Sequence, residues 1–500
     1  MSAHQTPLAS LTAAGARMGG HHPWPCSVAD EAVWRDAMDH LAAGSLTLLS
    51  LWGEAGRVHM ALLNPAEDPP IAVLSLDCPS GQYPSIGQAH APAIRLERSI
   101  RDLFQLEPQG LPDPRPWLDH GRWGGETPPA ASYPFLPVEG EALHQIPVGP
   151  VHAGIIEPGH FRFTAQGETV VRLEERLGYV HKGIDALLSG APIDRAAKIA
   201  ARTSGDSTVA YGFGFARAVE AALGITPPPR AIWLRAVMAE LERIANHFGD
   251  FGAICNDASF SIMLAHCAVL RERVLRAALA CFGHRLMMDR IVPGGVTVDL
   301  DGASVTLLRE LVVSLGGTFA PLVALYENTA SLQDRTVTTG ILKPDLARQF
   351  GAGGYVGRAS GRDFDARKSP GYPPYDMLEF NVPVLTEGDV NARAWIRVHE
   401  IRESLKLLEQ LLAGLPDGPV LAPLDGTFPG PAEGMALVEA FRGDLLVWLR
   451  IAGGHVDRCH LRDASWFQWP LLEAVIEGNI VADFPLCNKS FNCSYSGHDL

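Results

Sequence analysis

Three features that often reveal a function are missing from this sequence. No two of its eight cysteines have the C-x-x-C spacing with which one turn presents two thiolates to a metal. No apolar run reaches the roughly 20 residues of a membrane-spanning helix. The start, MSAHQTPLASLTAAGARMGG, lacks the basic-then-apolar order of a secretory signal. These absences argue against a disulfide framework and predict a chain that stays in the cytoplasm.

Basic residues are also scarce. The 41 Lys and Arg residues against 56 Asp and Glu residues give a formal charge of -15, which opposes non-specific attraction to nucleic acid or anionic lipid. We therefore expect protein or small-molecule partners, no nucleic acid, and membrane contact only through other subunits. With 500 residues, 47% of them hydrophobic, the chain can bury a large core in more than one domain.

The first 125 residues mix helix and strand patterns. VADEAVWRDAMDHLAAG has a helical pattern, whereas SLTLLSLWGE, RVHMALLNP and PPIAVLSLD are typical of strands. A helical stretch near APAIRLERSIRDLF comes next. The Pro- and Trp-rich GLPDPRPWLDHGRWGGETPPAASYPFLP then indicates a connection with few regular hydrogen bonds. We expect a small α+β domain over residues 1–125 and a linker over 126–144.

Residues 145–500 begin with short strands broken by glycine and proline, and then turn helical. PPPRAIWLRAVMAELERIANHFGDFG opens with prolines, which suit a first helical turn. It carries apolar residues at three- and four-residue steps: Leu234, Val237, Met238, Leu241, Ile244 and Phe248. Helical patterns over 259–289, 303–330 and 389–413 predict a bundle of long helices. Near the end, VEAFRGDLLVWLRIAGGHVDRCHLRDAS predicts a strand pair and WPLLEAVIEG a final helix. The expected fold class is α+β, with a long-helix bundle and peripheral short strands.

Several segments, in the same order over roughly 350 residues, resemble one family. They are GPVHAGIIEPGHFRF, VVRLEERLGYVHKGIDALL, AYGFGFARAVEAALGITPPPRAIWLRAVMAELERIANHFGDFG, MMDRIVPGGV, GYVGRASGRDFDAR, EGDVNARAWIRVHEIRESL and EGNIVADFPLCNKSFNCSYSGHDL. The family is that of the large subunit of membrane-bound (group 4) nickel-iron hydrogenases and the pocket-forming 49-kDa subunit of complex I. APAIRLERSIRDLFQLEPQGLPDPRPWL resembles the end of the 30-kDa subunit of complex I, which implies that residues 1–125 are that domain, fused to the larger one.

In the hydrogenase family, two C-x-x-C pairs hold nickel and iron, because nickel chemistry needs soft thiolates. Alignment on the Ala-Tyr of KIAARTSGDSTVAY places the first pair at Ala200 and Thr203. Alignment on SFNCSYSGHD places the second pair at Ser494 and Gly497. The resemblance therefore implies that all four metal ligands are missing and that this chain binds no metal of its own.

Two further sites of the family are altered. Cys487 and Cys493 lie near the second pair, but a spacing of six residues would not put both thiolates on one turn. Complex I is thought to use a histidine in the first strand turn and a tyrosine near the first pair at the quinone head. Here the turn reads IIEPGH and the tyrosine position falls near Ala201, so neither is clearly kept.

Other residues remain candidates for proton transfer. Glu157, in EPGH, matches the glutamate that hydrogenases are thought to use for moving protons, and a shielded carboxylate suits that task. The alternative is a turn carboxylate that accepts backbone N–H bonds. His160 is a second candidate, and His152 and His181 lie nearby in sequence, although a structural role explains a lone histidine equally well.

Two polar groups have open interpretations. Asp206 and Ser207 would line a polar pocket, or they would cap a helix. The segment GRASGRDFDARKSPGYPPYD carries five charged residues that would stabilise the pocket wall or form a solvated loop. They are Arg358, Arg362, Asp363, Asp365 and Arg367.

The resemblance implies a nickel-free large subunit of a membrane-associated, complex-I-like redox complex related to NADH:quinone oxidoreductase and group 4 hydrogenase. An iron-sulfur small subunit would deliver electrons, a quinone is one candidate acceptor, and antiporter-like and complex-I-like membrane subunits would couple proton or ion translocation. The chain would lie in the cytoplasm, peripheral on the inner face of the cell membrane. The alternative is a structural coupling subunit without catalysis, and a true nickel-iron hydrogenase is a remote third interpretation.

Overall fold

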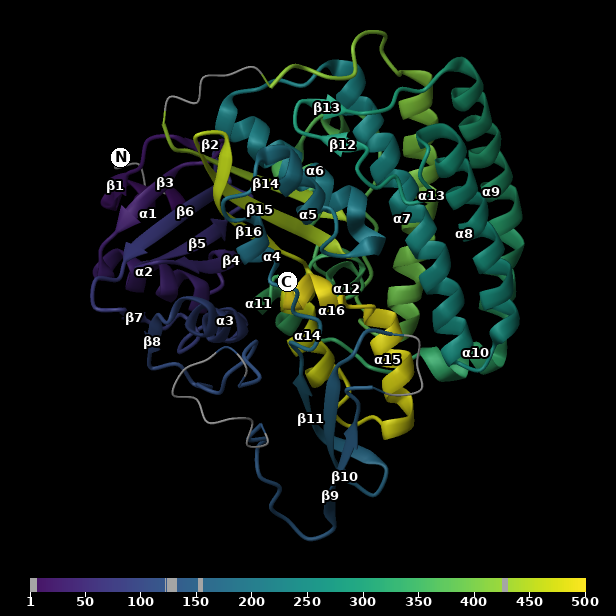
Figure 1. Ribbon diagram of the computed structural model, residues 1–500. Helices are drawn as coiled ribbons and strands as arrows, with labels where there is room; N and C mark the ends of the chain where they lie inside the picture. The colour runs from purple at the N-terminus through teal and green to yellow at the C-terminus, as the bar shows by residue number, and fades with distance from the viewer. Residues whose placement is uncertain (1–6, 122, 124–132, 152–155, 425–429) are drawn as a thin grey trace, which may run out of the picture.

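The computed structural model describes residues 7–121, 123, 133–151, 156–424 and 430–500 (Figure 1). Helices and short strands mix in several small sheets, which confirms the predicted α+β class. The N-terminal sheet lies on one side of the molecule and a bundle of long helices on the other, with a second sheet between them (Figure 1).

The N-terminal sheet has the strand order β1-β3-β6-β5-β4. Its elements, and the parallel pair β7 and β8 beside it, are α1 (Pro7–Ala14), β1 (Ala16–Arg17), β3 (Cys26–Ala29), α2 (Glu31–Ala42), β4 (Thr47–Glu54), β5 (Arg57–Leu63), β6 (Ile71–Asp77), β7 (Gln82–Pro84), α3 (Ile94–Phe104) and β8 (Glu107–Gln109). The three predicted strands are confirmed as β4, β5 and β6. Their residues are buried almost without alternation, as expected when both faces of a sheet are covered.

A four-stranded sheet, β16-β15-β14-β2, occupies the middle of the molecule. It comprises β2 (His21–His22), β14 (Ala432–Ala440), β15 (Gly443–Ala452) and β16 (His455–Arg462). The segment predicted as a strand pair is instead part of a three-stranded meander, because β14 starts earlier, at Ala432. Against this sheet packs Trp52 of β4, whose ring stacks on His460 with centroids 5.1 Å apart. The two sheets therefore share one core.

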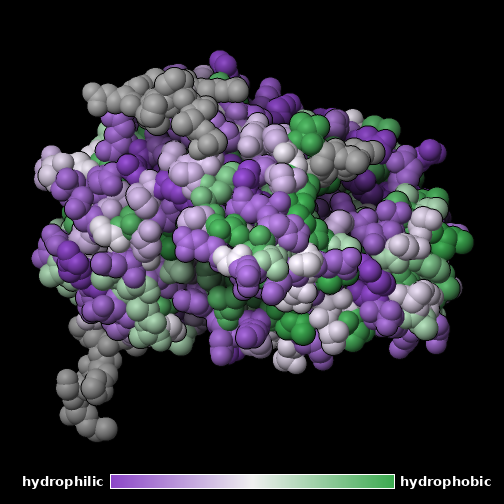
Figure 2. Space-filling view, turned by 90° about the horizontal axis from the view of Figure 1, so that it is seen from below, coloured by the Kyte–Doolittle hydropathy of each residue, from purple (hydrophilic) through white to green (hydrophobic). Residues whose placement is uncertain are grey.

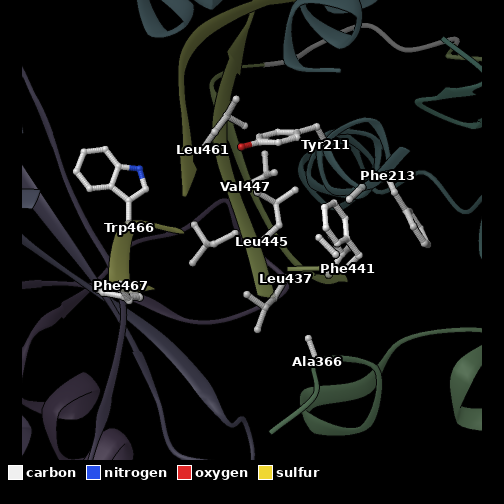
Figure 3. Packing of buried hydrophobic residues seen from close by; sticks show 14 of the residues in the cluster. Tyr211, Phe213, Ala366, Leu437, Phe441, Leu445, Val447, Leu461, Trp466 and Phe467 are labelled. Atoms are coloured by element: carbon white, nitrogen blue, oxygen red, sulfur yellow. The ribbon is translucent and has the colours of Figure 1, made fainter. Parts of the chain in front are cut away.

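Helix α6 (Thr208–Leu223) crosses the middle sheet. Its side chains Tyr211 and Phe213 point toward Leu445 and Val447 of β15 (Figure 3). A Cβ at Gly434 of β14 would lie only 1.9 Å from the carbonyl oxygen of Ala218, so glycine permits the close approach of helix and strand.

Four long helices form the bundle: α7 (Pro229–Asp257), α8 (Ser261–Phe282), α9 (Gly302–Asn328) and α13 (Val390–Ala413). All four were expected from the sequence, and the six apolar residues predicted for the core face of α7 are fully buried. Asp301 and Asp389 set the starts of α9 and α13, since each side chain accepts a backbone N–H three residues on. Among the described residues, α9 alone is long and apolar enough to cross a membrane; 39% of its most apolar window is buried, and core helices also meet this criterion.

A small antiparallel sheet, β11-β10-β9, projects at the lower end of Figure 1. It consists of β9 (Leu143–Val148), β10 (His160–Gln166) and β11 (Thr169–Arg176). The remaining elements are short: α4 (Ile184–Leu188), α5 (Ile193–Ala200), η2 (Gly205–Ser207), β12 (Ile291–Val292), β13 (Gly295–Val296), α10 (Ala330–Thr336), α11 (Pro344–Gln349), α12 (Gly354–Arg358), α14 (Ser465–Val475), α15 (Phe484–Phe491) and α16 (Tyr495–Asp499). The predicted final helix is present as α14, which begins at Ser465, and two shorter helices follow it.

The predicted division into residues 1–125, 126–144 and 145–500 stays a prediction. Residues 126–132 of the expected linker lie outside the described residues. Two elements cross the expected boundaries: β9 starts at Leu143, inside that linker, and β2 pairs with β14 of the larger part.

Candidate functional site

Two segments that the sequence analysis singled out meet in the structure. The Oγ atoms of Ser204 and Ser494 lie 3.1 Å apart, and both residues are buried. Ser204 precedes the turn η2 that leads into α6, and Ser494 is the N-cap of α16, where its Oγ accepts the N–H of Gly497 at 2.9 Å. The turn before α6 and the start of α16 therefore form one site.

The predicted first pair lies next to this contact. Ala200 ends α5 and Thr203 follows it, both fully buried, and Thr203 Oγ1 has no hydrogen-bond partner. The side chain that reaches Ser494 is that of Ser204. Ser204 and Ser207 also have the x-x spacing of a ligand pair, so the geometry favours these two as the counterparts of the first pair. The serine-x-x-serine spacing in RTSGDS was the sequence signal for this register.

Asp206 and Arg442 form the charged centre of the site. Arg442 donates from Nη2 to Oδ2 of Asp206 at 2.6 Å and from Nη1 to Oδ1 at 2.9 Å, and Ser204 Oγ donates to Oδ1 at 2.7 Å. Burial raises the pKa of Asp206, but the guanidinium and the hydroxyls outweigh burial and lower that pKa to about 2. Asp206 is therefore held as a carboxylate. The sequence analysis named it but missed Arg442.

Asp463 fills the space beside Gly497. Tyr211 donates its hydroxyl to Asp463 Oδ2 at 2.9 Å, and a Cβ at Gly497 would lie 2.8 Å from that same oxygen. Asp463 is buried, and its other oxygen accepts the N–H of Ser465 at 2.9 Å. A side chain at position 497 would collide with this carboxylate. Neither Asp463 nor Tyr211 was foreseen as part of the site.

Glu157 lies at the edge of the same site. Its side chain is exposed, and its Oε2 accepts the backbone N–H of Ser496 at 3.1 Å. This contact is the turn-carboxylate arrangement of the alternative interpretation, and it also brings Glu157 beside the start of α16. Its role in proton transfer stays a prediction.

The histidines lie apart from one another. His160 of β10 is buried against the small sheet: its Nδ1 is 3.2 Å from the carbonyl oxygen of Gly149, and its ring packs on Phe135. Burial lowers the pKa of His160, so the proton-transfer prediction for this residue gains no support from its position. His181 contacts the carbonyl oxygen of Asp499 at 2.7 Å through Nδ1. His152 lies outside the described residues.

The residues present do not fit a nickel-iron centre. Burial raises the pKa of Cys487 to about 12 and that of Cys493 well above its usual range, so neither thiol readily becomes the thiolate that a metal needs. Cys487 packs against Gly340, whereas the Sγ of Cys493 lies 3.9 Å from the Gln468 amide oxygen. Within the described ranges, no three or more His, Cys, Asp or Glu side chains are grouped so that they could hold a metal.

The charged segment after α12 is mostly buried. Arg358 pairs with Glu400 at 2.6 Å and with Glu439 at 2.8 Å, and Arg367 pairs with Glu240 at 3.0 Å. Asp365 is buried with them, and Asp363 is exposed. The solvated-loop alternative is therefore wrong for most of this segment, which ties α7, α13 and β14 together. The three glutamates were missed, because a buried carboxylate can be interpreted only once its partner is known.

Known proteins are similar to this chain. Residues 257–433 match the family described as the 49 Kd subunit of respiratory-chain NADH dehydrogenase. Formate hydrogenlyase subunit 5 of Escherichia coli is 29% identical over 85% of this chain and 78% of that protein. The carbon monoxide-induced hydrogenase of Rhodospirillum rubrum is 31% identical over 70% of this chain and 98% of that protein. The D-type subunit of NADH-quinone oxidoreductase from Desulfotalea psychrophila is 30% identical over 67% of this chain and 91% of its own length.

A solved structure has the same fold. A chain of the membrane-bound sulfane sulfur reductase, an archaeal respiratory membrane complex, superposes with a TM-score of 0.68 at 26% identity, over 73% of this chain and all of that one. The predicted resemblance is thereby confirmed for the larger part of the chain, whereas the fusion to a 30-kDa-like domain stays a prediction. This chain belongs to the family of complex-I-like large subunits that includes the 49-kDa, D-type subunit of NADH-quinone oxidoreductase and the large subunits of formate hydrogenlyase and related group 4 hydrogenases.

Proposed function

We propose that this chain is the nickel-free large subunit of a membrane-associated redox complex and takes part in electron transfer from an iron-sulfur partner. The observation that carries the proposal is near-complete coverage of relatives from respiratory and hydrogen-evolving enzymes, at 91% and 98% of their lengths. Electron arrival would be coupled to proton or ion translocation through antiporter-like and complex-I-like membrane subunits. A quinone is one candidate acceptor, and the chain itself would carry no cofactor.

A partner surface supports this placement. Seen from below, the molecule presents hydrophobic residues in the middle of one face, between more hydrophilic margins (Figure 2). The small sheet β9–β11 lies at this end (Figure 1), and its Val171 is 45% exposed. Apolar surface of this kind is typical of protein interfaces. We propose that partner subunits cover it and hold the chain on the inner face of the cell membrane.

A second candidate function is structural coupling, in which the chain transmits conformational change between partners without chemistry of its own. The Asp206–Arg442 pair favours it, because both charges are satisfied within the site. Asp463 favours it too, since its carboxylate fills the space beside Gly497. An active acceptor site, in contrast, would need room for a substrate and a group that exchanges protons.

Glu157→Gln in the intact complex separates the two functions. Loss of a required proton donor lowers turnover by about a hundredfold to ten-thousandfold, whereas a structural role leaves turnover intact. Glu168→Gln is the matched control, since Glu168 is exposed on the β10–β11 turn of the same sheet. The polypeptide composition of the complex is measured in the same preparations. Full turnover with normal assembly in Glu157→Gln would contradict the proton-donor role and favour structural coupling.

A further inference from the structure

Trp117 lies where the N-terminal region meets the end of the chain. It is 1% exposed, and Asp102 of α3 fixes the backbone around it. The Asp102 carboxylate oxygen Oδ2 accepts the N–H groups of Trp117, Leu118 and Asp119 at 2.6, 2.7 and 3.2 Å. Three bonds to one oxygen hold this segment in a single conformation relative to α3.

The indole of Trp117 reaches His498, which is fully buried. Trp117 Nε1 donates to His498 Nε2 at 3.3 Å, and His498 Nδ1 lies 2.9 Å from Asp499 Oδ1. An indole N–H is only a donor, so Nε2 must be the unprotonated nitrogen and Nδ1 must carry the hydrogen. Trp117 thus selects one neutral tautomer of His498.

The groups around His498 oppose its protonation. Burial lowers the pKa of His498, and although Asp499 raises it, Arg95 lowers it again. The guanidinium groups of Arg95 and Arg98 lie 4.7 and 4.5 Å from the centre of the Trp117 ring. A proton on Nε2 would place two donors face to face beside two arginines, with Asp463 the other acidic neighbour.

Helix α16 carries His498 together with two residues of the site, Ser494 at its N-cap and Gly497. Its other anchors come from the segment after β11: Lys182 N–H donates to Leu500 O at 2.7 Å, and Val180 N–H donates to Asp499 Oδ2 at 3.1 Å. Asp499 therefore bonds to both His498 and Val180. If the orientation of His498 changes, α16 loses a link in this chain of contacts.

We propose that Trp117 is a positioning residue for the candidate site, which holds His498 as a neutral acceptor and thereby fixes α16 with Ser494 and Gly497. Through Asp102 and α3, this contact ties the site to the N-terminal region. The inference rests on the proposed function only in taking the Ser494 cluster as the working site, and its test does not depend on turnover.

Trp466 provides a matched control. Its ring stacks on the same imidazole with centroids 4.1 Å apart, but its Nε1 is buried without a hydrogen-bond partner. Trp117→Phe removes a bonded N–H and Trp466→Phe an unbonded one, while both keep an aromatic ring on His498. Amide hydrogen exchange of peptides covering 178–183 and 494–500 is followed by mass spectrometry in the intact complex.

Trp117→Phe should speed exchange in both peptides about 5- to 10-fold, the effect of one lost hydrogen bond, while Trp466→Phe should change it less than twofold. The pH at which the peptides lose protection should also rise in Trp117→Phe, since the pKa of His498 is no longer held down by a facing donor. A merely structural defect would speed exchange equally at every pH. Equal effects of the two variants, or an unmoved pH midpoint, would overturn the proposal.

A second pair of variants covers the case in which Trp117→Phe fails to assemble. His498→Gln keeps an oxygen acceptor for the indole N–H and should retain at least half of the protection, whereas His498→Leu removes the acceptor and should lose it. Equal protection in these two variants would also contradict the positioning role.

Discussion

The hydroxyl oxygens of Ser204 and Ser494 lie 3.1 Å apart across 290 residues of chain. This contact joins the two segments at which relatives of the hydrogenase type hold their metal. In this chain the same place holds hydroxyls, the Asp206–Arg442 pair and the Asp463 carboxylate. The consequences for stability and metal content can be tested separately.

Asp206→Asn should destabilise the fold by about 2 to 4 kcal/mol, because it leaves the buried guanidinium of Arg442 without its anion. Asp77→Asn, at an exposed ion pair with Arg57, should cost less than about 1 kcal/mol. Urea unfolding of both variants measures the difference. Since the pKa of Asp206 is lowered from 3.8 to about 2, its stabilisation is present above pH 4 and is lost as pH falls toward 2. Equal costs for the two variants would contradict the account of the site.

Gly497→Ala tests the space that Asp463 fills. The new Cβ would lie 2.8 Å from a carboxylate oxygen, so overpacking should cost about 1 to 3 kcal/mol. Gly205→Ala in the same site is the control, because a Cβ there meets nothing within 4 Å. Thermal unfolding compares the two. An unchanged melting temperature in Gly497→Ala would show that the site has room for a side chain at this position.

The long helices and the central strands follow from local patterns, whereas most of the site does not. Apolar spacing and the prolines at the start of α7 predict that helix, and Asp301 and Asp389 cap α9 and α13 by short-range bonds. Asp206 and Arg442, in contrast, are 236 residues apart, and no local pattern relates them. Motif alignment located Ser494 and Gly497, but the register of the first pair depends on which side chain reaches Ser494, and that is a three-dimensional fact.

Glu242 should make stability depend on pH. Burial raises its pKa to about 8, against the donating N–H groups of Val209 and Ala210 at the start of α6. A carboxyl with a raised pKa stabilises the fold fully below its ordinary value of 4.5, and this contribution is lost as pH rises through 8. Glu242→Gln should therefore reduce the loss of stability between pH 5 and 8 in urea titrations. Glu310→Gln, exposed on α9, should leave that dependence unchanged, and an identical slope in both variants would count against this assignment.

Arg358→Met should be among the most destabilising single changes. It leaves the buried carboxylates of Glu400 and Glu439 without their shared cation, at a cost of about 3 to 5 kcal/mol. Arg348→Met removes an exposed partner of Asp345 and should cost less than about 1 kcal/mol. Chemical unfolding followed by circular dichroism measures both. A cost below 1 kcal/mol for Arg358→Met would mean that the buried cluster contributes little to holding α7, α13 and β14 together.

The central claim is that this large subunit works without nickel, because hydroxyl and carboxylate side chains stand where its hydrogenase relatives hold metal. Its most direct test is the nickel content of the purified intact complex from nickel-supplemented cells, measured by mass spectrometry with the chain quantified in the same sample. The account predicts well under about 0.1 nickel per chain, since no thiolate pair is available in the site. About one nickel per chain, retained after chelator treatment, would contradict it.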